Sequence, residues 1–123
     1  MAVRELDEHR CAYCHSPEFL TVTSFEIDHI VPLSAGGQTV VDNLCLACPV
    51  CNRHKYVRQT AVDPQTNLKV PLFHPRQQTW AEHFAWNEDR TEIDGLTPTG
   101  RATIHVLEMN RPRMANLRRL WVK

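Results

Sequence analysis

Two pairs of cysteines with the spacing Cys-x-x-Cys place the strongest constraint on how this chain can fold. Cys11 and Cys14 form the first pair, and Cys48 and Cys51 form the second, after 33 intervening residues. Zinc prefers four soft ligands in a tetrahedron, and two such pairs supply an all-thiolate site. The sequence therefore predicts a structural zinc ion that clamps the two ends of the intervening segment.

A fifth cysteine makes the second pair ambiguous, because Cys45-x-x-Cys48-x-x-Cys51 contains two overlapping pairs. Cys45 lies between Leu44 and Leu46 and has the surroundings of a buried apolar residue, so we take Cys48 and Cys51 as the ligands. An odd number of cysteines argues against a closed disulfide framework. The alternative, in which the paired cysteines are reduced and bind nothing, fits the paired spacing poorly.

The composition is that of a small globular protein. The chain has 123 residues, of which 42% are hydrophobic, and this fits one folded domain. The charged start, residues 1–10, lacks the apolar segment of a signal peptide, and no apolar run is long enough to span a membrane. We expect a soluble, cytoplasmic protein with no membrane partner.

A net charge of zero hides an uneven distribution. Residues 1–63 carry a net charge of −3 and residues 64–123 carry +3. The last stretch, residues 109–123, has no acidic side chain and has five basic ones, which are Arg111, Arg113, Arg118, Arg119 and Lys123. Such a run is usually a solvated helix face, although its charge suits a phosphate backbone.

The middle of the chain is predicted as strand, loop, strand and helix. β-Branched and aromatic residues predict a strand over residues 19–28. Residues 34–37 mark a loop, after which residues 39–41 would form a short return strand. A helix is expected from Pro49, where the missing N–H of proline costs nothing, to about Ala61.

The second half predicts a hairpin and two helices. Residues 63–67 have strong turn chemistry, and residues 84–86 and 91–96 would pair across a turn. One helix is expected to open at Thr99-Gly100 and a shorter one after Pro112. The apolar face of this shorter helix would hold Met114, Leu117, Leu120 and Trp121.

Residues able to accept a proton and to hold a divalent cation lie between the cysteine pairs and just after them. His29 can accept a proton from water, because a neutral imidazole titrates near physiological pH. Asp28 and Asn52 offer hard oxygen ligands, and two such ligands leave room for water and phosphate around one divalent cation. On an ideal strand Asp28 and His29 point to opposite faces, so the strand must end or twist there.

These residues, in the order Glu26-Ile27-Asp28-His29-Ile30-Val31-Pro32, then Asn43, then Asn52-Arg53-His54-Lys55, resemble the HNH, or ββα-metal, endonuclease family. The resemblance is greatest to the subgroup with two zinc-binding Cys-x-x-Cys hooks, and its motifs cover residues 11–55. It implies that His29 is the general base, that Asp28 and Asn52 hold a catalytic Mg²⁺ or Mn²⁺, and that Asn43 braces the loop and orients the base. Many members have histidine where this chain has Asn52, and His54 does not match that position.

The resemblance implies an α+β fold and a function. A zinc-stapled ββα-metal core would occupy residues 11–62 and a hairpin-plus-helices extension residues 63–123, together forming a single HNH endonuclease domain, residues 1–123. The expected activity is hydrolysis of DNA, most simply duplex DNA, with one catalytic metal ion. The expected nucleic-acid contacts, for which a solvated face is the alternative, are Arg53, His54, Lys55 and Arg58. A zinc-hook module that binds nucleic acid without cutting it, and an RNA-directed nuclease, are the rival functions.

Overall fold

The computed structural model describes residues 2–121, without the side chain of Trp121. The chain forms two compact units. The first runs to Gln59 and includes His74–Gln77, and the second consists of Thr60–Phe73 and the chain from Gln78 onward. This division does not test whether both parts act as one endonuclease domain, which stays a prediction.

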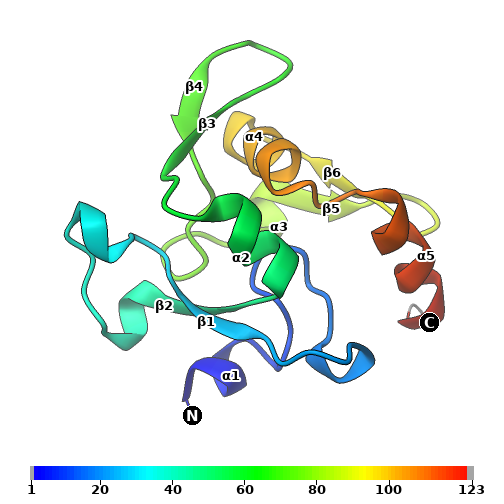
Figure 1. Ribbon diagram of the computed structural model, residues 1–123. Helices are drawn as coiled ribbons and strands as arrows, with labels where there is room; N and C mark the ends of the chain where they lie inside the picture. The colour runs from blue at the N-terminus through cyan, green and yellow to red at the C-terminus, as the bar shows by residue number, and fades with distance from the viewer. Residues whose placement is uncertain (1, 122–123) are drawn as a thin grey trace. The chain divides into compact units, whose positions relative to one another are not determined.

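The first unit contains the predicted order of strand, strand and helix (Figure 1). β1 and β2 pair in antiparallel fashion, with Asp28 opposite Cys45 and His29 opposite Leu44, and α2 follows β2 and contacts β1. The helices and strands of this unit are α1 (Ala2–Leu6), β1 (Glu26–His29), β2 (Leu44–Ala47) and α2 (Pro49–Lys55). Short 3₁₀ turns span Glu18–Leu20, Leu33–Ala35 and Val41–Asn43.

The strand predicted over residues 19–28 is wrong over most of its length, because only Glu26–His29 is a strand. Before it, the chain folds back on itself through bonds to Glu18. The Glu18 carboxylate accepts a hydrogen bond from the Phe25 N–H at 2.7 Å, and the Thr21 hydroxyl donates to the Glu18 carbonyl oxygen at 2.9 Å. Such local bonds between side chain and backbone compete with strand pairing.

The return strand lies at Leu44–Ala47 rather than at the predicted residues 39–41. Residues 39–41 are exposed, and a 3₁₀ turn begins at Val41. All four residues of β2 are buried, so the alternation that marks a half-exposed strand is missing from its sequence. The central helix was also predicted too long. It ends at Lys55 because Tyr56 leaves the helical region, and residues 60–62 form a strand instead of the last helical turn.

A buried ion pair connects three parts of the first unit. Both terminal nitrogens of Arg76 bind the Asp7 carboxylate, at 2.8 and 2.9 Å. Asp7 Oδ2 also accepts a hydrogen bond from the Leu46 N–H of β2 at 2.8 Å. The side chains of Asp7 and Arg76 thereby join the end of α1, the edge of β2 and the segment His74–Gln77.

As far as residue 121, the second unit consists of two hairpins and three helices, so the predicted hairpin and the two predicted helices are confirmed. β3 pairs with β4, and β5 pairs with β6, both in antiparallel fashion. Its elements are β3 (Thr60–Val62), β4 (Lys69–Pro71), α3 (Trp80–His83), β5 (Phe84–Trp86), β6 (Ile93–Gly95), α4 (Pro98–Leu107) and α5 (Pro112–Trp121). With its short helices and small sheets, the protein has the predicted α+β fold. Among residues 2–121, no helix has the length and apolar character that a membrane span requires.

The first turn of α4 packs closely against the end of α3. The Thr97 hydroxyl caps α4 by accepting a hydrogen bond from the Gly100 N–H at 3.0 Å. A Cβ atom at Gly100 would lie 2.1 Å from the His83 carbonyl oxygen, so this contact requires glycine.

The basic C-terminal run is not wholly a solvated face, because Arg118 of α5 is fully buried. Its guanidinium donates to the backbone oxygens of Thr91 and Met109 and lies 5.3 Å from the centre of the Trp86 ring. Leu120, predicted on the apolar face of this helix, is instead 71% exposed. The side chain of Trp121 and Lys123, both also named above, lie outside the described residues.

A second ion pair stabilises the second unit. Arg101 of α4 binds the buried Asp63 carboxylate through Nε at 2.9 Å and through Nη2 at 2.8 Å. The same carboxylate accepts hydrogen bonds from the Gln65 N–H and the Thr66 hydroxyl, and so fixes the turn between β3 and β4. The bonds from Arg101 hold the pKa of the Asp63 carboxyl well below its ordinary value.

We expect Asp63→Asn to lower the melting temperature by several degrees at neutral pH. Because the pKa of Asp63 is depressed in the folded state, its stabilising contribution is complete above the ordinary pKa of an aspartate and is lost as the pH falls. The difference between wild type and variant should therefore shrink below about pH 4. Thermal melts of both proteins at several pH values test this. The exposed Asp94→Asn is the control, and a loss as large in that variant would contradict the prediction.

Candidate functional site

The four predicted zinc ligands lie together in the first unit. The sulfur atoms of Cys11, Cys14, Cys48 and Cys51 are all buried and lie within 4.8 Å of one another. The sulfurs of Cys14 and Cys48 are 3.8 Å apart. A tetrahedral zinc ion with Zn–S bonds of about 2.3 Å needs sulfurs about 3.8 Å apart. The cluster therefore fits a structural zinc ion.

Local backbone geometry presents these sulfurs to one another. Cys11 and Cys14 flank a tight turn in which the His15 N–H donates to the Cys11 carbonyl oxygen at 2.9 Å. Cys48 begins α2, and its sulfur accepts the Cys51 N–H at 3.4 Å. Burial raises the pKa of the Cys11 thiol well above its ordinary value, and a zinc ion would bind it as the thiolate.

Cys45 points away from the cluster, in agreement with its predicted exclusion. Its sulfur lies 3.7 Å from the Tyr13 hydroxyl and 3.9 Å from Asp28 Oδ2. Burial raises the pKa of Cys45 to about 12, so the thiol is protonated at neutral pH. Cys45 therefore packs against the Asp28 carboxylate instead of binding the metal.

Asp28 is paired with a buried lysine. Lys55 Nζ of α2 lies 3.0 Å from Asp28 Oδ2 and donates a hydrogen bond to the His29 carbonyl oxygen at 3.1 Å. Only 2% of the Lys55 side chain and 8% of the Asp28 side chain are exposed. The Tyr13 hydroxyl donates to the same Oδ2 atom at 3.4 Å. Burial nevertheless raises the pKa of Asp28, and the attraction of the Lys55 ammonium does not offset it.

His29 and Asn43 shape the loop that follows β1. The His29 Nε2 atom lies 2.9 Å from the Thr39 hydroxyl. The Asn43 side chain accepts a hydrogen bond from the Val31 N–H at 2.8 Å and donates to the carbonyl oxygens of Val31 and Gln38. Asn43 thus braces the loop, as the resemblance implies. Its influence on the base stays a prediction.

Asn52, the other predicted ligand of the catalytic ion, contacts β1 through an acidic side chain. Its amide nitrogen donates to Glu26 Oε1 at 2.7 Å. Glu26 and Asp28 are two residues apart on one strand and so share a face, which is the face that α2 covers. The structure therefore connects Asn52 to Glu26 and Asp28 to Lys55, while His29 bonds to Thr39.

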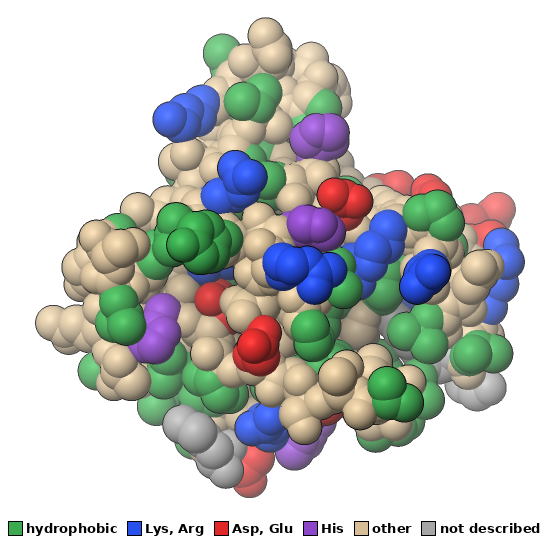
Figure 2. Space-filling view, in the orientation of Figure 1, with side chains coloured by type: hydrophobic (Ala, Val, Ile, Leu, Met, Phe, Trp, Pro, Cys, Tyr) green, Lys and Arg blue, Asp and Glu red, His purple; other side chains and the backbone are tan. Residues whose placement is uncertain are grey.

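The predicted nucleic-acid contacts divide into two groups. Arg53 and Arg58 are exposed and His54 is half-buried, so these three can meet a ligand. Figure 2 shows basic and histidine side chains at the surface over α2, and acidic ones over the neighbouring β1. Lys55 differs from the prediction, because it points inward and is bound by Asp28.

Glu26 and Lys55 are the two residues whose positions the sequence reasoning missed. The alternation of side chains along a strand could have placed Glu26 beside Asp28. The spacing of three residues between Asn52 and Lys55 could have placed both on the strand-facing side of the helix. Nothing in the sequence indicated the deep burial of Lys55, because lysine side chains are normally exposed.

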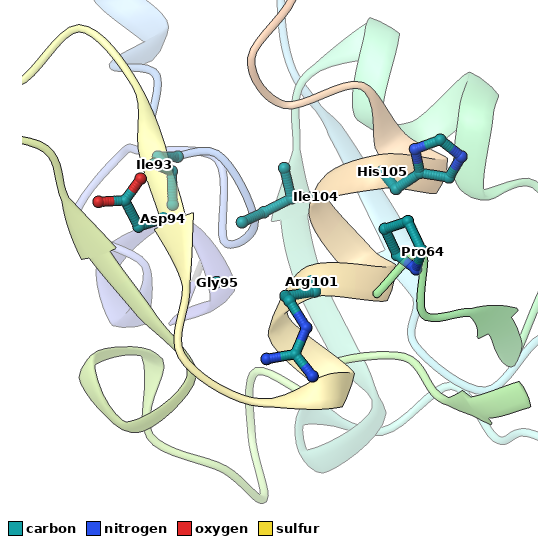
Figure 3. A pocket seen from close by; sticks show the side chains of 7 residues that line it. All are labelled: Pro64, Ile93, Asp94, Gly95, Arg101, Ile104 and His105. Carbon is teal, nitrogen blue, oxygen red and sulfur yellow. The ribbon is translucent and has the colours of Figure 1, made fainter. Parts of the chain in front are cut away.

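A separate hollow of about 270 Å³ lies in the second unit, lined by Pro64 and by side chains of β6 and α4 (Figure 3). Arg101 contributes to its wall, but the guanidinium is bound by Asp63. None of the residues predicted to be catalytic lines this hollow.

Comparisons with known proteins match the part of the chain that holds this site. The family model "HNH endonuclease" matches residues 11–58. A CRISPR-associated endonuclease Cas9 from Corynebacterium diphtheriae is 45% identical over 47 residues, which cover 37% of this chain and 4% of that protein. The chain thus matches only a small part of this curated relative. No solved structure matches the chain.

We expect Cys11→Ser to lose stoichiometric zinc and to lower the melting temperature by about 10 °C or more, because metal binding at such sites contributes folding free energy. Zinc content and circular-dichroism melting test this. The matched control is Cys45→Ala, which removes a buried thiol outside the cluster and should keep its zinc. Equal zinc loss in both variants would contradict the assignment of the four ligands.

We expect Lys55→Met to destabilise the protein by about 3 kcal/mol, because it leaves the Asp28 carboxylate buried without its partner. Urea denaturation measures this free energy of unfolding. Arg53→Met removes an exposed cation from the same helix and should cost less than about 0.5 kcal/mol. Similar values for the two variants would show that the buried ion pair contributes nothing specific.

Proposed function

Because the chain belongs to the HNH endonuclease family through residues 11–58, we propose that it is a metal-dependent endonuclease that hydrolyses phosphodiester bonds in duplex DNA. The observation that carries this proposal is the bonding of Lys55. Its ammonium contacts the Asp28 carboxylate and the His29 carbonyl oxygen, and so attaches the end of β1 to α2, which carries Asn52. The proposed base and the two proposed ligands therefore come from elements that are bonded to each other.

Asp28 and Asn52 are the proposed ligands of one Mg²⁺ or Mn²⁺ ion. The bonds described above use Oδ2 of Asp28 and the amide nitrogen of Asn52, so Oδ1 and the amide oxygen are the atoms suited to a hard cation. Two carboxylates, Asp28 and Glu26, and one ammonium, Lys55, leave a net negative charge that favours a cation. Such an ion supplies a Lewis acid that stabilises negative charge on the phosphate.

His29 is the proposed general base. The Thr39 hydroxyl lies at hydrogen-bond distance from Nε2 and can accept its proton, a bond that favours the tautomer in which Nδ1 is the acceptor. Nδ1 then takes a proton from the attacking water while the water oxygen bonds to phosphorus. The bond from phosphorus to the 3′ oxygen breaks on the opposite side, and that oxygen takes a proton from solvent. The ends produced are a 5′-phosphate and a 3′-hydroxyl.

We expect the wild-type protein to nick supercoiled plasmid DNA when Mg²⁺ or Mn²⁺ is added. The His29→Ala variant should cut at least about 100-fold more slowly, because the base is lost. Gel analysis of plasmid forms over time measures both rates. The melting temperature should stay close to that of wild type, because the half-buried His29 side chain makes a hydrogen bond, among residues 2–121, only with the exposed Thr39 hydroxyl. His105→Ala, which removes an exposed histidine of α4, is the control for histidine content.

The same assay, repeated with duplex DNA and with single-stranded RNA as substrates, separates the rival functions. Binding of DNA without cleavage by either protein would replace the proposal with a zinc-hook binding module. Cleavage of single-stranded RNA alone would assign an RNA-directed nuclease. Cutting by His29→Ala at the wild-type rate would show that another group is the base.

A further inference from the structure

The carboxyl end of α2 exposes an aromatic ring beside the candidate site. Tyr56 directly follows Lys55, and 75% of its surface is exposed. Its N–H donates to the Asn52 carbonyl oxygen at 2.9 Å, so Tyr56 closes the last turn of the helix that carries Asn52. A ring this exposed contributes little to the core of the first unit.

The backbone at Tyr56 is strained. Its φ is 47° and its ψ is −117°, a region that residues with a side chain rarely adopt. Helices commonly end with glycine at such positive-φ positions, because glycine pays no steric cost there. The chain therefore keeps a large ring where glycine would be more stable, and strained positions of this kind cluster at functional sites.

Two exposed cations, Arg53 and Arg58, lie close to Tyr56 along the chain, one on each side of it. Arg58 folds back over the carboxyl end of α2, where its Nε donates to the His54 carbonyl oxygen at 3.2 Å and its N–H to the Lys55 carbonyl oxygen. Arg53 lies three residues before Tyr56, about one helical turn away. Proteins that bind single-stranded nucleic acids combine basic side chains, which contact phosphates, with aromatic rings, which stack on bases.

We propose that Tyr56 stacks on a nucleobase of the DNA strand whose phosphate is held at Asp28 and Asn52, with Arg53 and Arg58 on neighbouring phosphates. This inference rests on the proposed nuclease function and identifies the surface that positions its substrate. A base must leave its own stack to meet the ring. The protein would therefore bind DNA with an unpaired base more tightly than a continuous duplex.

Binding to short labelled oligonucleotides tests the stacking. In a His29→Ala parent, which slows cleavage, we expect Tyr56→Ala and Tyr56→Gly to weaken the binding of an oligothymidylate of about 15 nucleotides by about tenfold. Tyr56→Phe keeps the ring and should bind within about twofold of the parent. On an abasic oligonucleotide of equal length the penalty of Tyr56→Gly should vanish. Phe19→Ala, which removes a ring that is 78% exposed in the same unit, is the matched control.

Two further measurements separate a binding role from a structural one. Tyr56→Gly removes the backbone strain, so it should melt at or above the temperature of the parent while binding less tightly. The dependence of affinity on salt should keep the parent's slope in Tyr56→Gly, whereas Arg58→Ala should reduce the slope by about one, because only the second change removes a phosphate contact.

Parent-like affinity of Tyr56→Gly, an equal penalty on the abasic oligonucleotide, or a lowered melting temperature that accounts for the weaker binding would each overturn the inference. These outcomes differ from a failure of the proposed function. If the wild type cuts DNA and the Tyr56 variants match their parent, only the stacking is wrong. If the wild type neither binds nor cuts nucleic acid, both proposals fall together.

Discussion

The cluster of four buried thiols is the constraint on which the first unit depends. It brings the turn at Cys11 and Cys14 against the start of α2 at Cys48 and Cys51, so β1, its loop and β2 all lie within one closed segment. The register of β1 on β2 then decides which face each side chain takes. An ion that holds these thiolates therefore also ties the start of the segment that carries His29 to the helix that carries Asn52.

In both units, buried charges are balanced by ion pairs rather than by solvent. Asp7 binds Arg76, Asp28 binds Lys55, and in the second unit Asp63 binds Arg101. Much of the formal charge counted along the sequence is therefore not available at the surface. Arg101 and Arg118 both belong to the basic half of the chain, yet one is neutralised by a carboxylate and the other is buried against backbone oxygens and the Trp86 ring.

The sequence predicts those features that depend on spacing and fails where tertiary contacts decide. The four ligands follow from Cys-x-x-Cys spacing, and the start of α2 follows from Pro49. The position of β2 does not, because a strand buried on both faces has no alternation to read. Lys55 was predicted to contact nucleic acid because it lies on the helix of the motif, and only the nearby Asp28 explains why it is buried instead. The residue types of the candidate site follow from the sequence, whereas the bonds among them do not.

Under the proposed nuclease function, the pairing of Asp28 with Lys55 has a consequence for anyone who wants an inert form of this protein that captures substrate. Replacing Asp28 by alanine would leave an ammonium stranded in the interior, so inactivity could reflect a damaged scaffold as readily as a missing ligand. The His29 ring makes its contact at the surface, with the Thr39 hydroxyl. Its removal separates chemistry from folding, which makes position 29 the sounder choice for trapping an intact complex.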